Sequence, residues 1–81
     1  MNDPLDWLRV RDICGRNRIG KTKLYGDIKA GLYPPPIKPT RNTAIWLHRE
    51  DDAIRRAKIR GDTDEQIRSI VREVTAARAG V

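Results

Sequence analysis

The residues best suited to chemistry in this sequence are cations, hydroxyls and amides gathered in two short stretches. The first stretch holds Lys21, Thr22, Lys23, Tyr25 and Lys29, and the second holds Lys38, Arg41 and Asn42. Lysine and arginine bind phosphate oxygens, while threonine and asparagine side chains also reach the edges of bases. The combination predicts a surface that recognises nucleic acid, with Arg16 or Arg18 as a further phosphate contact.

Other chemistries have little support in the sequence. Cys14 and His48 are the only cysteine and histidine, which excludes an internal disulfide and a zinc site made by this chain alone. The acidic run at residues 50–52 is explained more simply as the start of a helix than as a metal cluster. We therefore expect no catalytic residue, no metal, no cofactor and no small-molecule substrate, so the chain is not predicted to be an enzyme.

Size and charge narrow the class of partner. The 81 residues suffice for one compact domain, and the net charge of +6 attracts polyanions. A merely solubilising surface is the alternative explanation of the charge, and RNA stays open, although no aromatic stacking platform is visible. No apolar run approaches the roughly 18 residues that span a bilayer, and the first residues lack a secretory pattern. We expect a cytoplasmic protein with no membrane partner.

The first stretch of cations is predicted to lie on a helix over residues 20–30. Gly20 suits its N-cap, and Gly31 suits the left-handed position after its end. Leu24 and Ile28, four residues apart, form the inward stripe, so the opposite face carries the cations and hydroxyls. A shorter helix over residues 11–17 is expected before it, led in by an extended or one-turn segment at Trp7 and Leu8 that packs beneath.

The second stretch is predicted to lie on a hairpin. Three consecutive prolines, residues 34–36, stop the preceding helix and favour extended backbone. Strands at residues 37–38 and 44–47 then flank a loop whose tip carries Arg41, with Asn42 suited to a positive φ. A third helix is expected from Arg49 to about Arg60, where Gly61 ends it. Its basic second half is explained by the helix dipole.

A last helix is predicted over residues 64–78. Thr63 and Gln66 have the spacing of a capping box, which marks its start. Its apolar face is formed by Ile67, Ile70, Val71, Val74 and Ala77. Whether this face packs on its own chain or on a partner is left open by the sequence. We divide the chain into a DNA-binding domain, residues 1–61, and a C-terminal helix, residues 62–81, that is a candidate oligomer or partner contact.

Several motifs together resemble the AlpA family of small phage and prophage regulators, which are related to excisionases. They are Arg9-Val10-Arg11-Asp12-Ile13, Lys21-Thr22-Lys23-Leu24-Tyr25, Ile28-Lys29-Ala30-Gly31-Leu32-Tyr33-Pro34 and Ile45-Trp46-Leu47. The resemblance covers about residues 8–58 and implies a MerR-like winged helix-turn-helix, mainly α with a small β-hairpin. It also implies a recognition helix at residues 21–25, a phosphate contact from Tyr25, a wing tip at Arg41 and Asn42, and a core role for Trp46.

The sequence departs from the family pattern at several positions. Arg18 stands where the family turn usually has glycine, and Gly20 where it has a serine-like cap. On the third helix, Asp51 and Ile54 replace an apolar residue and an aromatic one. The helix after Gly61 extends beyond the usual domain.

Two functions follow as hypotheses. The first is a sequence-specific protein of double-stranded DNA, either a transcription regulator or an excisionase-like recombination factor, acting as a homodimer or a cooperative array. The second is a protein-interaction adaptor that recruits an integrase or a polymerase. In either case the expected contact to the partner or second copy is the last helix, through Ile67, Ile70, Val71 and Val74.

Overall fold

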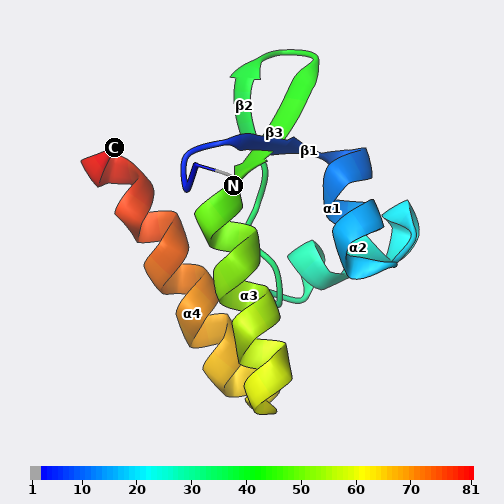
Figure 1. The fold of residues 1–81 in the computed structure, drawn as a ribbon, viewed down its shortest axis with the longest axis vertical. Coiled ribbons are helices and arrows are strands. Elements are labelled where there is room, and N and C mark those ends of the chain that lie inside the picture. Colours follow the sequence, from blue (N-terminus) through cyan, green and yellow to red (C-terminus); the bar gives the residue numbers. More distant parts are fainter. Residues whose placement is uncertain (1–2) are drawn as a thin grey trace.

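The computed structural model describes residues 3–81, which form four α-helices and a small antiparallel sheet (Figure 1). In chain order the elements are β1 (Trp7–Arg9), α1 (Val10–Asn17), α2 (Lys21–Lys29), β2 (Ile37–Thr40), β3 (Thr43–Leu47), α3 (His48–Arg60), α4 (Asp64–Ala76) and the 3₁₀ helix η1 (Ala77–Gly80). The prediction of a mainly helical fold with a small hairpin is confirmed at this level. The predicted helix positions are correct to within about two residues.

The sheet has three strands in the order β1-β3-β2. Trp7 lies opposite Leu47 in the β1–β3 pair, and Thr40 lies opposite Thr43 in the β2–β3 pair. The expected five-residue loop at the hairpin tip is therefore a two-residue turn, Arg41–Asn42. Asn42 does not have the predicted positive φ, because Arg18 is the one non-glycine residue among residues 3–81 with that geometry. The hairpin projects from the body of the molecule (Figure 1).

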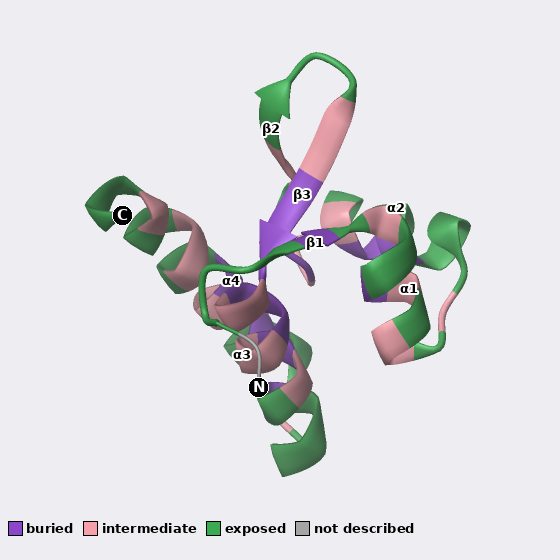
Figure 2. Cartoon of the chain, turned by 45° about the horizontal axis from the view of Figure 1, so that its top comes forward, coloured by how far each residue is buried: buried purple, intermediate pink, exposed green. Residues whose placement is uncertain are grey.

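The core is built around Trp46 of β3, which is fully buried as predicted. Its indole N–H donates to the carbonyl of Pro34 at 2.8 Å, and its ring meets that of Tyr33 edge-on, with centroids 6.0 Å apart. Residues 34–36, which we call the proline strap, therefore form a fixed connection between α2 and the hairpin. β3 is half-buried near the turn and becomes buried where it enters the body (Figure 2).

The apolar face of α4 belongs to this same core. Ile67 and Val71 are buried in it, Ile70 packs against it, and α4 lies along α3. These side chains therefore pack on their own chain, which the sequence had left open. Ile67 and Val71 cannot serve as the predicted oligomer or partner contact without unpacking the core. The core also crosses the predicted domain boundary at residue 61.

Trp7 differs from expectation, whereas the acidic run begins α3 as predicted. Trp7 does not pack beneath the first helix but is 59% exposed. Glu50 and Asp51 lie in the first turn of α3 and are completely buried. Buried carboxylates require partners, because losing their hydration is costly.

Asp51 joins three parts of the chain through its carboxylate. It accepts hydrogen bonds from Arg16 Nε at 2.7 Å, from Asn17 Nδ2 at 2.9 Å and from the Tyr33 hydroxyl at 2.7 Å. Arg16 also donates to Asp52 at 3.0 Å. These bonds fix α1 and the segment after α2 against the start of α3, and they leave Arg16 unavailable as the predicted phosphate contact.

Glu50 anchors the C-terminal end in the same way. Arg78 of η1 donates to its carboxylate from Nε at 2.6 Å and from Nη2 at 2.9 Å, and Nη2 also reaches the Pro35 carbonyl at 2.8 Å. Arg68 of α4 donates to the carbonyl of Ala30, at the end of α2, at 3.0 Å. The last third of the chain thus holds both α2 and the proline strap.

Arg18 caps α1 in the left-handed conformation, with φ 54° and ψ 47°. This backbone conformation costs a residue with a Cβ about 1 kcal/mol, and glycine is free of that cost. We expect Arg18→Gly to raise the free energy of unfolding by about 0.5–1 kcal/mol in urea denaturation. Gly61→Ala, at φ 82°, is the converse control and should destabilise. A less stable Arg18→Gly protein would contradict the assignment.

Burial and the neighbouring charges of Asp51 and Glu50 raise the pKa of Tyr33. The folded state therefore keeps the phenol neutral after the unfolded chain has lost its proton. The stability that comes from keeping Tyr33 protonated is complete below pH ~10, where the phenol of the unfolded chain is also protonated. It falls as pH rises further, by at most about 1.4 kcal/mol per pH unit. Tyr33→Phe should flatten the fall in unfolding free energy between pH 9.5 and 11. Equal slopes for the two proteins would show that Tyr33 is not buried in this way.

Candidate nucleic-acid interface

The net positive charge comes entirely from one part of the chain. Residues 9–41 contain nine lysines and arginines against two aspartates, a net charge of +7. The remaining residues contain eight basic and nine acidic side chains, a net charge of −1. The positive field therefore originates in α1, α2 and the hairpin, which favours a polyanion partner at those elements over a uniformly solubilising surface.

The outer face of α2 is exposed, as the apolar stripe of Leu24 and Ile28 on its inner face predicted. Leu24 is fully buried and Ile28 packs against the core. The exposed residues of this helix include Lys21, Thr22, Lys23, Tyr25, Gly26 and Lys29. Gly26 adds no bulk to this face, and no other part of the protein comes within 4 Å of the position a Cβ would take. A partner can approach the helix backbone closely at that point.

Lys23 differs from the other cations of α2 because it has an internal partner. Its Nζ donates to Asp27 Oδ1 at 2.8 Å, and Asp27 is buried. This hydrogen bond raises the pKa of Lys23. Lys23 is therefore not the free cation that its residue type predicted, because Asp27 lies one helical turn further along. The ammonium has two further donors, so Lys23 is better suited to a fixed directional contact than to mobile charge neutralisation.

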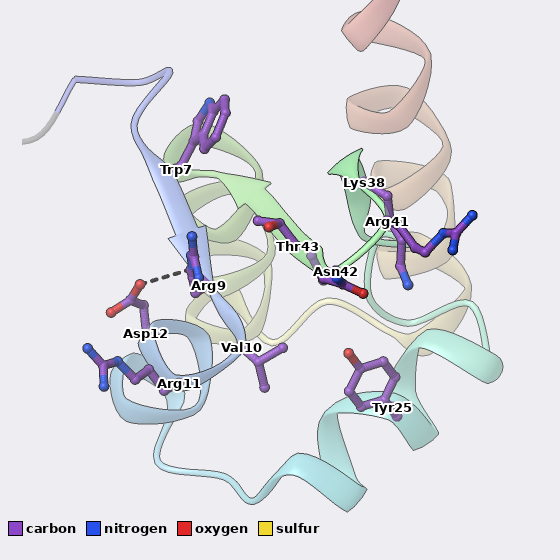
Figure 3. A pocket seen from close by; sticks show the side chains of 11 residues that line it. Trp7, Arg9, Val10, Arg11, Asp12, Tyr25, Lys38, Arg41, Asn42 and Thr43 are labelled. Carbon is purple, nitrogen blue, oxygen red and sulfur yellow. Dashed lines mark hydrogen bonds between the residues drawn. The ribbon is translucent and has the colours of Figure 1, made fainter.

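The hairpin and the two helices border a common groove of about 970 Å³ (Figure 3). It is lined by Trp7, Arg9, Val10, Arg11, Asp12, Tyr25, Lys38, Arg41, Asn42, Thr43 and Ala44. The structure thus brings together Tyr25, Lys38, Arg41 and Asn42, which the sequence analysis assigned to separate elements. Lys21, Thr22, Lys23 and Lys29 lie on α2 outside the residues that line the groove, and Arg18 lies in the turn between α1 and α2.

Arg9 and Arg11 are groove residues that the sequence analysis missed. They flank Val10, where β1 passes into α1. A three-residue strand is too short to show an alternating pattern, so nothing indicated that this segment pairs with β3 and faces the hairpin. Asp12 is the one acidic residue of the groove, and its carboxylate already accepts the backbone N–H of Arg9 at 2.8 Å, which caps α1.

Over residues 3–81, no three His, Cys, Asp or Glu side chains are grouped to hold a metal ion. Nor does any helix in that range combine the length and apolar character needed to cross a bilayer. Comparisons with protein families, with curated proteins and with solved structures find no match. The resemblance to the AlpA family accordingly stays a prediction.

The Lys23–Asp27 pair makes a prediction about stability. Lys23→Ala leaves a buried carboxylate without its lysine, and such a group is destabilising. We expect a lower urea midpoint for Lys23→Ala than for Lys21→Ala, the matched control on the same helix. Adding Asp27→Asn to Lys23→Ala should recover part of the loss. If the two single lysine variants have the same midpoint, the pair does not stabilise the fold.

Proposed function

We propose that the chain is a winged helix-turn-helix protein that binds double-stranded DNA, with α2 in the major groove and the hairpin turn at the adjacent minor groove. The observation that carries the proposal is the common groove shared by Tyr25 of α2 and the turn residues Arg41 and Asn42. A helix and a wing can grip one duplex together only when they face the same side. The concentration of charge in residues 9–41 supports the same surface.

The shape of α2 fits this role. A helix with its side chains is about 10–12 Å across, and the major groove of B-DNA is about 12 Å wide. The outer face of α2 is low in bulk at Thr22 and Gly26, which favours close approach to base edges. In this arrangement Thr22 and Lys23 read bases, while Lys21, Lys29 and Arg41 contact phosphates. Arg18 and Lys38 are further phosphate contacts.

The biological role that we propose is regulation of transcription or excisionase-like control of recombination, as the AlpA resemblance implies. One such domain reads only a few base pairs, so useful specificity requires a homodimer or a row of copies. The adaptor alternative has lost much of its support, because Ile67 and Val71 are part of the core. A partner contact through α4 would have to use Val74 and its neighbours, which are only partly buried.

The test is the salt dependence of duplex binding. Neutralisation of about four to six phosphates gives a slope of log K against log salt of roughly −4 to −5. The double variant Lys21→Ala/Arg41→Ala should bind more weakly and should reduce the magnitude of the slope by about 2. Lys23 is left intact because its loss would also affect folding.

The matched control is Arg56→Ala/Lys58→Ala, which removes the same charge from exposed positions on α3. This control should keep the wild-type slope. If both double variants weaken binding equally, the interaction is a diffuse effect of net charge and the proposal fails. Unchanged binding by Lys21→Ala/Arg41→Ala at physiological salt would also contradict it.

A further inference from the structure

The groove beside the hairpin has cations on both of its walls. Arg9 and Arg11 lie on the β1–α1 wall, and Lys38 and Arg41 lie on the hairpin wall (Figure 3). Within residues 3–81, none of these four side chains forms an ion pair. The carboxylate of Asp12 faces the same groove but accepts the N–H of Arg9. Four like charges around one groove repel each other, and an anion seated between them relieves that repulsion.

The position of the groove identifies the anion, if the proposed function holds. At Tyr25 the groove lies between α2, which we place in the major groove of DNA, and the hairpin turn, which we place in the minor groove. The ridge between a major and a minor groove of a duplex is one sugar–phosphate backbone. That backbone must therefore pass between α2 and the hairpin, which is where the groove lies.

We infer that this groove is a binding site for the backbone of one DNA strand, with Arg9 and Arg11 as phosphate contacts that complete the site from the side opposite the wing. The volume of about 970 Å³ is far larger than a single phosphate needs and suits a short stretch of strand. The Tyr25 ring, which stands between α2 and the hairpin, contacts the same strand (Figure 3). This inference rests on the proposed function and extends it to the β1–α1 segment.

Trp7 lies at one end of the groove, and a DNA strand bound in the groove accounts for the exposure of its side chain. The indole is 59% exposed in the free protein, and its apolar face can cover a deoxyribose of the bound strand. The second tryptophan, Trp46, is fully buried in the core. A change in intrinsic fluorescence on DNA binding therefore reports on Trp7.

The first test uses Arg9→Gln and Arg11→Gln with an otherwise intact chain. Each should weaken binding to a duplex by roughly tenfold at 0.1 M salt and reduce the magnitude of the salt slope by about 0.9. Arg56→Gln on α3 and Arg72→Gln on α4 are matched controls, exposed and of equal charge, and should leave both quantities unchanged. Urea midpoints measured in parallel establish that the variants are folded.

The second test locates the contact on DNA. Single methylphosphonate substitutions remove one backbone charge at a time from a duplex. At the phosphate that Arg9 contacts, the substitution should weaken wild-type binding but should have no further effect on Arg9→Gln. DNA should also quench the fluorescence of the wild-type protein, whereas Trp7→Phe should show little change.

The outcomes separate the two proposals. Wild-type affinity and slope for Arg9→Gln and Arg11→Gln, together with weaker binding and a smaller slope for Lys21→Ala/Arg41→Ala, would overturn the groove assignment and leave the proposed function standing. Absence of any duplex binding by the wild-type protein would overturn both. If a single-stranded oligonucleotide binds at least as tightly as the duplex and depends on Arg9 and Arg11, the groove holds a free strand and the duplex placement is wrong.

Discussion

The arrangement of the whole molecule depends on the buried carboxylate of Asp51. It is fully inaccessible to solvent and would be strongly destabilising alone, so the fold is stable only when its three donors converge on it. Those donors come from Arg16 and Asn17 at the end of α1 and from Tyr33 after α2. The same bonds thereby set the angle of the α1–α2 pair against α3, and with it the direction in which the outer face of α2 points.

The internal ion pairs also explain where positive charge remains without an acidic partner. Glu50 and Asp51, both buried, are each paired with an arginine, from η1 and α1 respectively. The groove contributes only one carboxylate, and that one caps a helix. The cations of residues 9–41 are thus left mostly uncompensated on one side of the molecule, while the α3–α4 side is close to neutral overall. Such an asymmetric field orients a protein on a polyanion before contact is made.

The sequence was sufficient for the helices and insufficient for the polar interior. Glycines and a capping box predicted the helix ends, because few residue types adopt left-handed backbone or cap the exposed N–H groups of a helix. Gly20, Gly31, Gly61 and Thr63 all act as predicted. The burial of Glu50 and Asp51 could not be predicted, because residue type alone favours exposure and their partners are 28 and 35 residues away. Arg9 and Arg11 were missed because pairing of β1 with β3 is a long-range event with no local pattern.

Whether α2 and the hairpin face one duplex can be decided by following backbone amide resonances of the labelled protein during titration with a short duplex. This placement of the duplex predicts shifts confined to residues 9–12, 18–29 and 38–43. It predicts none along the exposed side of α3 and α4 between residues 55 and 72. Shifts centred on that α3–α4 side, with α2 and the hairpin turn unaffected, would contradict it.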